Sequence, residues 1–484
     1  MPPRWPTLAV FGSRLRLTPP LSCWKEPPGR HSNRESHPRS AALSTLRRST
    51  MPYFPNTDGA FNDFKNWLSL LKERGGEASS YEERVQTLLV SLRDQLVTEV
   101  EQAPVMEDEP SDLETIRALR PRGPRRLVAS LDSETLLDKL LGAWLGRAAG
   151  CILGIPCEGM SKPAIRNAAK GMGMRYPLSD YWLLDPKFAG ADAKHYGVTP
   201  RQNFLKGKLK YVGTDDDLAY TLLGLLILED HGVEFTTGNV GEAWLKYLPM
   251  ACTAEAVALS TLRAGVSAAE CGAKDNPFVD WIGADIRSDP WGYAAPGCPE
   301  KAAEFAYRDA SISHRATGIH GEMFFSAAIA AAFVVDDPVE ALEIGLTEIP
   351  KNCRTTAAVK EALRWCKRDG DWDKTTGRIL AKYEGMSMAH TLNNAALTVA
   401  GLYYGAKDFG KTIALTVMGG VDTDCTGATA GSLLGAVLGA KHLPKSWAEP
   451  LGTRAESYLI DQRWWRHNSI VKRFAKVAQQ VLAN

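Results

Sequence analysis

The chain has 484 residues, of which 23% are charged and 44% hydrophobic, and its formal net charge is +1. This is the composition of an ordinary folded protein, long enough to bury at least one large core. The basic residues are unevenly placed, because residues 1–50 carry eight Arg and one Lys against only Glu26 and Glu35. Since this excess lies in a Pro/Ser-rich tail, and no basic stripe interleaved with aromatic residues occurs elsewhere, a nucleic-acid partner is not expected.

Residues 1–50 allow two interpretations. Their Arg-rich, Ser-rich and acid-poor start resembles a mitochondrial transit peptide. Five prolines among the first twenty residues would break the amphipathic helix that such a peptide needs, which favours a disordered segment or a start at Met51. We therefore expect a cytoplasmic protein, with mitochondrial import as the alternative.

The nine cysteines and the longest apolar run describe the environment of the chain. The cysteine count is odd and contains no CxxC pair, which favours a reducing compartment. The apolar run around Met323–Val335 is shorter than the roughly 20 residues that a membrane span requires. It predicts a buried core helix and no membrane partner.

The first helical signals come before the main domain. Residues 79–101 place Ser80 and Glu83 in capping-box spacing, followed by leucines at helical intervals. Residues 107–124 are charged and interrupted by prolines, which is typical of a linker or strap. The expected organisation is a disordered or targeting segment at 1–50, a helical extension with linker at 51–130, and a catalytic domain at 131–484.

From residue 132 onward the pattern favours an all-α fold. A capped helix leads into a Gly/Ala-rich stretch ending at Gly150, and similar stretches recur at 327–332, 395–405 and 428–440. Runs of alternating β-branched residues never exceed a few positions. Two long segments rich in Gly, Pro and aromatic residues, 161–212 and 271–300, are expected to be loops that build a site.

The first chemical motif is Thr214-Asp215-Asp216-Asp217, which opens directly onto a long apolar stretch. A single Asp here would be explained by N-capping, because it accepts the free N–H groups of a helix start. Three consecutive carboxylates exceed what one cap uses. The surplus indicates a bound cation.

The second motif has the same form. Asp422 and Asp424 precede another small-residue helix, with Cys425 and Thr426 following and glycines on both sides. Five carboxylates at two helix starts would repel one another unless a hard divalent cation neutralised them. Oxygen donors of this kind favour Mg²⁺ or Mn²⁺ over Zn²⁺.

A third motif places Glu158 just beyond the Gly/Ala helix, after Gly154-Ile155-Pro156-Cys157. Glu158 is either a solvated loop residue or a ligand or general base, since a carboxylate among apolar residues is positioned for a raised pKa.

These three motifs, in this order, resemble the ADP-ribosylglycohydrolase family, which includes the dinitrogenase-reductase-activating glycohydrolases, over about residues 132–445. Gly146–Glu158 resembles the family's Gly-x-x-x-Gly-Asp-x-x-Gly-x-x-x-Glu segment, with Cys151 where Asp is common. Thr214–Asp217 resembles its Thr-Asp-Asp-Thr motif, and the following helix fits best if Asp216 and Asp217 are the paired aspartates. Residues 422–426 resemble its closing Gly-Gly-Asp-Thr-Asp-Thr-Asn, with Cys425 in place of a Thr.

The resemblance implies a compact orthogonal multi-helix domain that hydrolyses a glycosidic bond to ribose in an ADP-ribosylated protein or small molecule, as a monomer or small homo-oligomer. It implies two Mg²⁺ or Mn²⁺ ions that hold the ribose hydroxyls and polarise a water molecule. The implied metal ligands are Thr214, Asp215, Asp216, Asp217, Asp422, Asp424 and Cys425, the implied catalytic residues are Glu158, Asp216 and Asp424, and the implied substrate-binding residues are Gly283, Arg287 and His314.

Two alternatives stay open. The family's phosphate loop is reduced here to Trp281–Arg287, in which Asp285 would repel a phosphate. The substrate is then a different ribosyl or glycosyl conjugate. Cys425, a soft ligand that suits Mg²⁺ poorly, keeps a catalytically silent ligand-binding relative as the other alternative.

Overall fold

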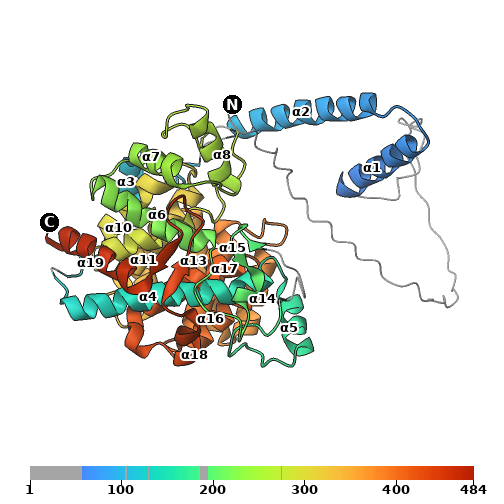
Figure 1. Ribbon diagram of the computed structural model, residues 1–484. Helices are drawn as coiled ribbons and strands as arrows, with labels where there is room; N and C mark the ends of the chain where they lie inside the picture. Colours follow the sequence, from blue (N-terminus) through green and yellow to red (C-terminus); the bar gives the residue numbers. More distant parts are fainter. Residues whose placement is uncertain (1–56, 104–105, 129, 186–193, 274, 484) are drawn as a thin grey trace, which may run out of the picture. The chain divides into compact units, whose positions relative to one another are not determined.

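The structure is a computed structural model that describes residues 57–103, 106–128, 130–185, 194–273 and 275–483 (Figure 1). The expectations for residues 1–50 lie outside these ranges. In the described residues α-helices dominate, and the named strands form two short antiparallel pairs, β1 with β2 and β3 with β4. The prediction of an all-α fold is confirmed.

The helices and strands have the following bounds. The helices are α1 Thr57–Glu73, α2 Ser79–Glu101, α3 Leu113–Leu119, α4 Ser133–Gly154, α5 Lys162–Gly171, α6 Asp216–His231, α7 Thr237–Tyr247, α8 Thr253–Arg263, α9 Asp289–Ala294, α10 Pro299–Ala310, α11 Thr317–Ala332, α12 Pro338–Gly345, α13 Arg354–Asp369, α14 Trp372–Lys382, α15 Thr391–Gly405, α16 Phe409–Val417, α17 Thr423–Leu438, α18 Lys445–Ala448 and α19 His467–Ala483. The strands are β1 Lys194–His195, β2 Thr199–Pro200, β3 Arg454–Glu456 and β4 Trp464–Arg466.

The chain divides into two compact units, of which the first ends at Gln95 and the second begins at Leu96. Helix α2 forms over residues 79–101, as its capping and periodicity predict. The second unit holds α3 to α19 and both of the acidic motifs. The domain boundaries at residues 50 and 130 stay predictions.

Helices α11 and α4 lie in the core of the second unit. Every residue of α11 is buried, which confirms the core helix expected around Met323–Val335. By length and composition Ser133–Cys157 could also cross a membrane, but 89% of the tested stretch is buried inside the protein. The buried core helix of a soluble protein has the same length and composition.

Glycines bring α4 and α17 into backbone contact. The facing pairs are Gly142 with Gly435, Gly146 with Gly431, and Gly150 with Gly427. A Cβ atom at Gly150 would lie only 1.8 Å from the Gly427 carbonyl oxygen, so no larger residue fits without parting the helices. Because the pairs run in opposite directions along the chain, the two helices are antiparallel. The end of α4, before Glu158, therefore lies against the start of α17.

The linker and both expected loops differ in part from the sequence prediction. The expected loop at 161–212 contains α5, the short strands β1 and β2 and a 3₁₀ turn at Arg201–Phe204. Residues 107–124 contain α3 and are tied to the domain, since Arg120 pairs with Glu348 at 2.6 Å and Glu300 at 2.5 Å. The prediction that 271–300 is a loop is wrong in part, because this segment contains α9 and a 3₁₀ turn at Asp285–Arg287, all buried. Trp291 and Tyr293 pack there in the core.

Candidate functional site

The first acidic motif sends its three carboxylates to three different places. Asp215 caps α6 by accepting the N–H of Asp217 at 3.1 Å, and its other oxygen lies 2.7 Å from His195 Nε2. Asp216 lines a cavity. Asp217 is fully buried, and one of its oxygens forms an ion pair with Arg147 at 3.0 Å. One oxygen of Asp216 also accepts the Asp217 N–H at 3.1 Å, so bonds to the helix start account for Asp215 and one oxygen of Asp216, but not for Asp217.

Arg147 anchors this motif to α4. Its guanidinium is fully buried and donates to the Asp217 carbonyl at 2.8 Å and to the Ile286 carbonyl at 2.6 Å. It also pairs with the buried carboxylate of Asp289. The start of α6 is thus fixed against the same helix that the glycine contact joins to α17.

The second motif is held by α15 and α4. The backbone N–H of Asp422 donates to the Asn394 side-chain oxygen at 3.3 Å, and the Thr423 hydroxyl donates to the Gly154 carbonyl at 2.8 Å. The Asn394 amide donates in turn to the Met388 carbonyl at 2.7 Å. One buried amide at the start of α15 therefore positions both the second acidic motif and the 387–389 segment.

The structure brings the two motifs together. Donor atoms of Asp217, Asp424 and Cys425 lie within 4.8 Å of one another, as do those of Cys151, Asp215 and Asp217. One carboxylate oxygen of Asp217 and one of Asp424 are buried without a hydrogen-bond partner, as is the Thr214 hydroxyl. Buried polar atoms are rarely left without a partner, so these orphaned oxygens are ready-made ligand atoms.

The carboxylates in this cluster repel one another. Burial, followed by the neighbouring carboxylates, raises the pKa of Asp216 and Asp424 well above the usual range. Burial and Glu158 raise the pKa of Asp422 to about 6. Only the pKa of Asp215 is lowered, because His195 outweighs the effect of burial. In the described residues no Lys or Arg pairs with Asp216, Asp422 or Asp424.

These carboxylates face a cavity of about 410 Å³. Its acidic lining residues are Glu158, Asp216, Glu255, Asp422 and Asp424. The remaining walls are aromatic, thiol, small or apolar side chains and one histidine, namely His195, Tyr196, Tyr220, Cys252, Thr253, Trp281, Ile282, Gly283, Ile286, Ser387, Met388, Ala389 and Cys425. The cavity therefore carries five carboxylates and no Lys or Arg among its lining residues.

Several residues that line the cavity were not predicted from the sequence. His195 and Trp281 lie in the two segments expected to build a site, but neither was predicted as a site residue. Glu255 gave no signal, because it lies in the first turn of α8, where an acidic residue is ordinary.

The three residues predicted to bind substrate do not all line the cavity. Gly283 lines the cavity, and a Cβ atom there would lie 2.3 Å from Glu255 Oε1, so glycine allows that carboxylate to approach. Arg287 and His314 are buried and do not line it. The His314 ring lies 2.8 Å from the Ser313 hydroxyl. Their direct contact with a substrate stays an untested prediction.

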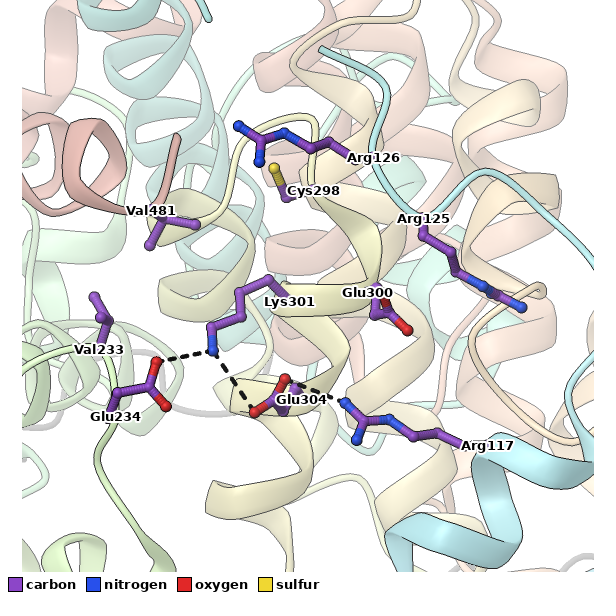
Figure 2. A pocket seen from close by; sticks show the side chains of 10 residues that line it. All are labelled: Arg117, Arg125, Arg126, Val233, Glu234, Cys298, Glu300, Lys301, Glu304 and Val481. Carbon is purple, nitrogen blue, oxygen red and sulfur yellow. Dashed lines mark hydrogen bonds and ion pairs between the residues drawn. The ribbon is translucent and has the colours of Figure 1, made fainter. Parts of the chain in front are cut away.

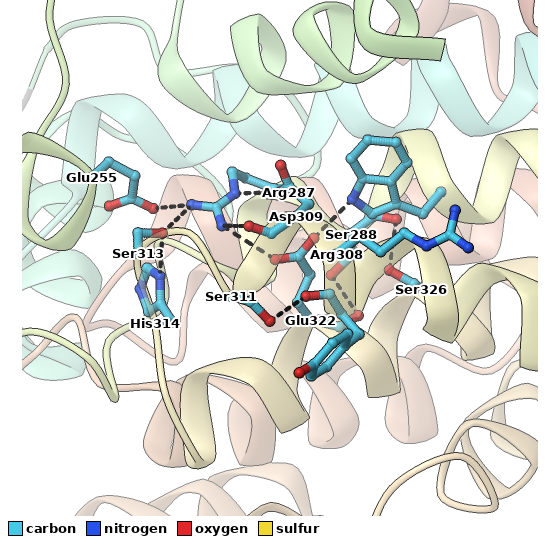
Figure 3. Close-up of polar contacts among 12 residues, drawn as sticks. Glu255, Arg287, Ser288, Arg308, Asp309, Ser311, Ser313, His314, Glu322 and Ser326 are labelled. Carbon is cyan, nitrogen blue, oxygen red and sulfur yellow. Dashed lines mark hydrogen bonds and ion pairs between the residues drawn. The ribbon is translucent and has the colours of Figure 1, made fainter. Parts of the chain in front are cut away.

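Arg287 lies at the centre of a second buried cluster (Figure 3). Its guanidinium contacts Asp309 at 2.6 Å, Glu255 at 2.7 Å and Glu322 at 3.5 Å. Glu255 in turn lines the cavity. The arginine expected to hold a phosphate thus lies behind the cavity wall and orients one of its carboxylates.

A larger cavity of about 550 Å³ lies between α3, α10 and the end of α19 (Figure 2). Lys301 pairs there with Glu234 at 3.2 Å and Glu304 at 3.6 Å, and Glu304 also accepts from Arg117. Among its lining residues no buried side-chain nitrogen or oxygen atom lacks a hydrogen-bond partner. The carboxylate-lined cavity is the stronger candidate site.

The fold and the cavity define an all-helical protein with a buried carboxylate site. The sequence profile of the ADP-ribosylglycohydrolase family matches residues 132–480, so the chain belongs to that family. A solved structure of an ADP-ribosylglycohydrolase-related protein complex is similar at 19% identity with a TM-score of 0.48, covering 72% of this chain and 99% of that chain. No curated protein matches the chain.

Proposed function

We propose that this chain is a divalent-metal-dependent hydrolase that cleaves the glycosidic bond between ribose and its partner in an ADP-ribosyl conjugate. Family membership supports a glycohydrolase, and members generally depend on a metal. The observation that carries the proposal is the pair of acidic motifs. Asp216, Asp422 and Asp424 line the cavity without a Lys or Arg partner in the described residues, and one oxygen each of Asp217 and Asp424 is buried without a hydrogen-bond partner.

The donor set fits Mg²⁺ or Mn²⁺. Thr214, Asp215, Asp216, Asp217, Asp422 and Asp424 offer hard oxygen atoms, and Cys425 is the single soft neighbour. Asp217 contributes the oxygen that Arg147 does not engage. Two ions would account for the number of carboxylates. When bound, they would neutralise these groups, orient ribose hydroxyls and polarise a water molecule.

The residues of the chain supply the remaining chemistry. Hydrolysis requires a water oxygen to bond to the anomeric carbon while the bond to the leaving group breaks through an oxocarbenium-like state. Glu158, which lines the cavity together with Asp422 and Asp424, accepts the water proton and returns it to the leaving group. The carboxylates of Asp216 and Asp424 stabilise the positive charge that develops on the ribose ring. Tyr196, Tyr220 and Trp281 provide flat surfaces for a sugar or a base.

A second candidate is a hydrolase of a glycoside that carries no phosphate. The observation in its favour is that no Lys or Arg lines the cavity in the described residues, and that Arg287 is committed to three carboxylates. A diphosphate would then meet Glu255 without a cation from the chain, which is electrostatically unfavourable.

Calorimetric titration of the full-length protein separates these functions. ADP-ribose and unphosphorylated ribose are each titrated with and without Mg²⁺ or Mn²⁺. Metal-dependent binding of ADP-ribose supports the first proposal and justifies assays on ADP-ribosylated arginine, serine and acetyl esters. Metal-dependent binding of ribose alone favours the second candidate. If neither metal nor sugar binds, the chain is a silent relative and both proposals fail.

A matched pair of variants tests the acidic motifs. Asp424→Asn should abolish metal-dependent turnover while leaving the helical circular dichroism spectrum unchanged. The control is Asp371→Asn, which makes the same chemical change at an exposed helix cap on α14. An active Asp424→Asn enzyme would exclude the proposed metal assignment.

A further inference from the structure

A second group of potential metal ligands lies outside the cavity and has no part in the proposed hydrolysis. It joins three segments that are far apart in the sequence: Glu109 before α3, His320 on α11, and Cys353 at the N-cap of α13. All three residues are buried, and one donor atom of each lies within 4.8 Å of the others. Unlike the cavity, this group combines oxygen, nitrogen and sulfur.

The hydrogen bond at one ring nitrogen of His320 determines whether the other ring nitrogen carries a proton. Its Nε2 lies 2.8 Å from the Pro110 carbonyl oxygen, which can only accept, so Nε2 carries a proton. In the neutral ring Nδ1 then holds a lone pair. That atom is buried without a hydrogen-bond partner and lies 3.5 Å from a Glu109 carboxylate oxygen. A lone pair facing a carboxylate is unfavourable unless a proton or a metal ion lies between them.

The surroundings orient each donor. One Glu109 oxygen accepts from the backbone N–H of Arg354, and the other from the Thr317 hydroxyl at 3.2 Å. The Cys353 sulfur lies at the N-terminus of α13, where it accepts from the backbone N–H of Thr356 at 3.5 Å and donates to the Thr356 hydroxyl at 3.4 Å. A carbonyl on the second nitrogen of a ligating histidine is the usual outer contact of protein metal sites.

The mixed donor set and the one close donor pair are compatible with zinc. Zinc binds nitrogen, oxygen and sulfur with bonds of about 2.0–2.3 Å, which places the donors of a tetrahedral site roughly 3.3–3.7 Å apart. The 3.5 Å separation of His320 Nδ1 from the Glu109 oxygen lies in this range. One thiolate and one carboxylate also balance the charge of Zn²⁺ in a buried site.

We propose that Glu109, His320 and Cys353 bind a structural zinc ion that fastens the segment before α3 to α11 and α13. The three protein donors leave the fourth tetrahedral position to a water molecule, whereas most structural zinc sites have four protein ligands. The site is chemically distinct from the carboxylate cavity, whose hard oxygen donors favour Mg²⁺ or Mn²⁺. Because Glu109 belongs to the segment preceding the family-matched residues, the ion would hold that segment on the domain.

The first test is the metal content of the full-length protein, purified in buffer with Mg²⁺ and trace zinc, by mass spectrometry. We expect about one zinc ion per chain. Replacing it with Co²⁺ should give the thiolate-to-cobalt absorption band in the near ultraviolet. Cys353→Ser should lose the zinc and the band. Cys366→Ser, a buried thiol on the same helix α13, should retain both.

Two further variants keep the test decisive. Cys425→Ser should retain the band, because that thiol belongs to the cavity. If Cys353→Ser does not fold, Glu109→Gln replaces it and should weaken zinc affinity at least tenfold in competition with a chromogenic chelator. Failure of the wild-type protein to take up zinc, or loss of the band in Cys425→Ser but not in Cys353→Ser, would overturn the proposal. A protonated His320, whose pKa its neighbours raise to about 9 against the effect of burial, would then fill the gap.

Discussion

Two buried clusters of carboxylates lie on either side of the cavity wall and are neutralised in different ways. Around Arg287, the carboxylates of Glu255, Asp309 and Glu322 share one guanidinium (Figure 3). Burial and Asp309 also raise the pKa of Glu322 well above its usual range, so a proton supplies more of the balance. In the cavity, Asp216, Asp422 and Asp424 have no Lys or Arg partner within the described residues.

The difference shows which cluster the chain completes by itself. A buried charge is costly unless it is paired, and the Arg287 cluster shows that this fold places an arginine where its own carboxylates need one. The cavity cluster lacks that arginine, and one oxygen of Asp424 is buried there without a hydrogen-bond partner. We infer that the first cluster is structural, and that the second depends on a cation from solution.

The largest expected effect comes from removing the internal cation. Arg287→Leu leaves three buried carboxylates without their guanidinium, so the free energy of unfolding should fall by about 3–5 kcal/mol. Urea unfolding followed by circular dichroism measures the change. The matched control is Arg364→Leu on the surface of α13, which breaks only the exposed pair with Glu361. Equal stability of the two variants would show that protons, and not Arg287, neutralise that cluster.

The second effect concerns the external cation. If the cavity binds Mn²⁺ or Mg²⁺, an ion at one hundred times its dissociation constant should stabilise the wild-type protein by about 2.7 kcal/mol. Urea unfolding with and without the added ion, at equal zinc content, measures the difference. Asp424→Asn should lose this gain, whereas Asp309→Asn in the Arg287 cluster should keep it. Equal stabilisation of both variants would place the metal outside the cavity.

The third prediction is that an Asp→Asn substitution changes the free energy of unfolding in opposite directions in the two clusters. In metal-free buffer Asp424→Asn removes a carboxylate that faces other carboxylates, so it should raise the free energy of unfolding by about 1 kcal/mol. Asp309→Asn removes the closest partner of Arg287, at 2.6 Å, and should lower it by about 1–3 kcal/mol. The same chemical change therefore distinguishes an unbalanced cluster from a balanced one. Changes of the same sign would remove the contrast.

Local patterns were enough to predict the helical fold and the position of α2. The small-residue stretches gave the buried helices, because glycine and alanine at helical spacing allow close packing. The acidic motifs stood out for a similar reason, since three consecutive carboxylates exceed the needs of one helix cap. These signals lie within a few residues of each other, so a single sequence contains them.

Partners distant in the sequence could not be predicted in the same way. Arg287 matched the position of a phosphate ligand by resemblance, but its side chain lies behind the wall because Glu255, 32 residues earlier, and Asp309 compete for it. Glu255 itself had no signal, since its role depends on the approach that Gly283 permits. Tertiary contacts decide which of several acidic residues faces a cavity.

The smallest expected effect is a pH dependence of stability that comes from His467 and from neither cluster. His467, on α19, accepts a hydrogen bond from the Trp144 indole N–H at 2.9 Å, and burial lowers its pKa to about 4. Between this value and about 6.5 the unfolded chain binds a proton that the folded protein does not, so stability falls as the pH decreases through that window. At pH 5.5 the loss relative to pH 7.5 should be about 1 kcal/mol, and His467→Gln, which does not titrate, should lack it. Urea unfolding of both proteins at the two pH values measures the difference. Parallel losses would mean that His467 does not contribute to the acid sensitivity of the fold.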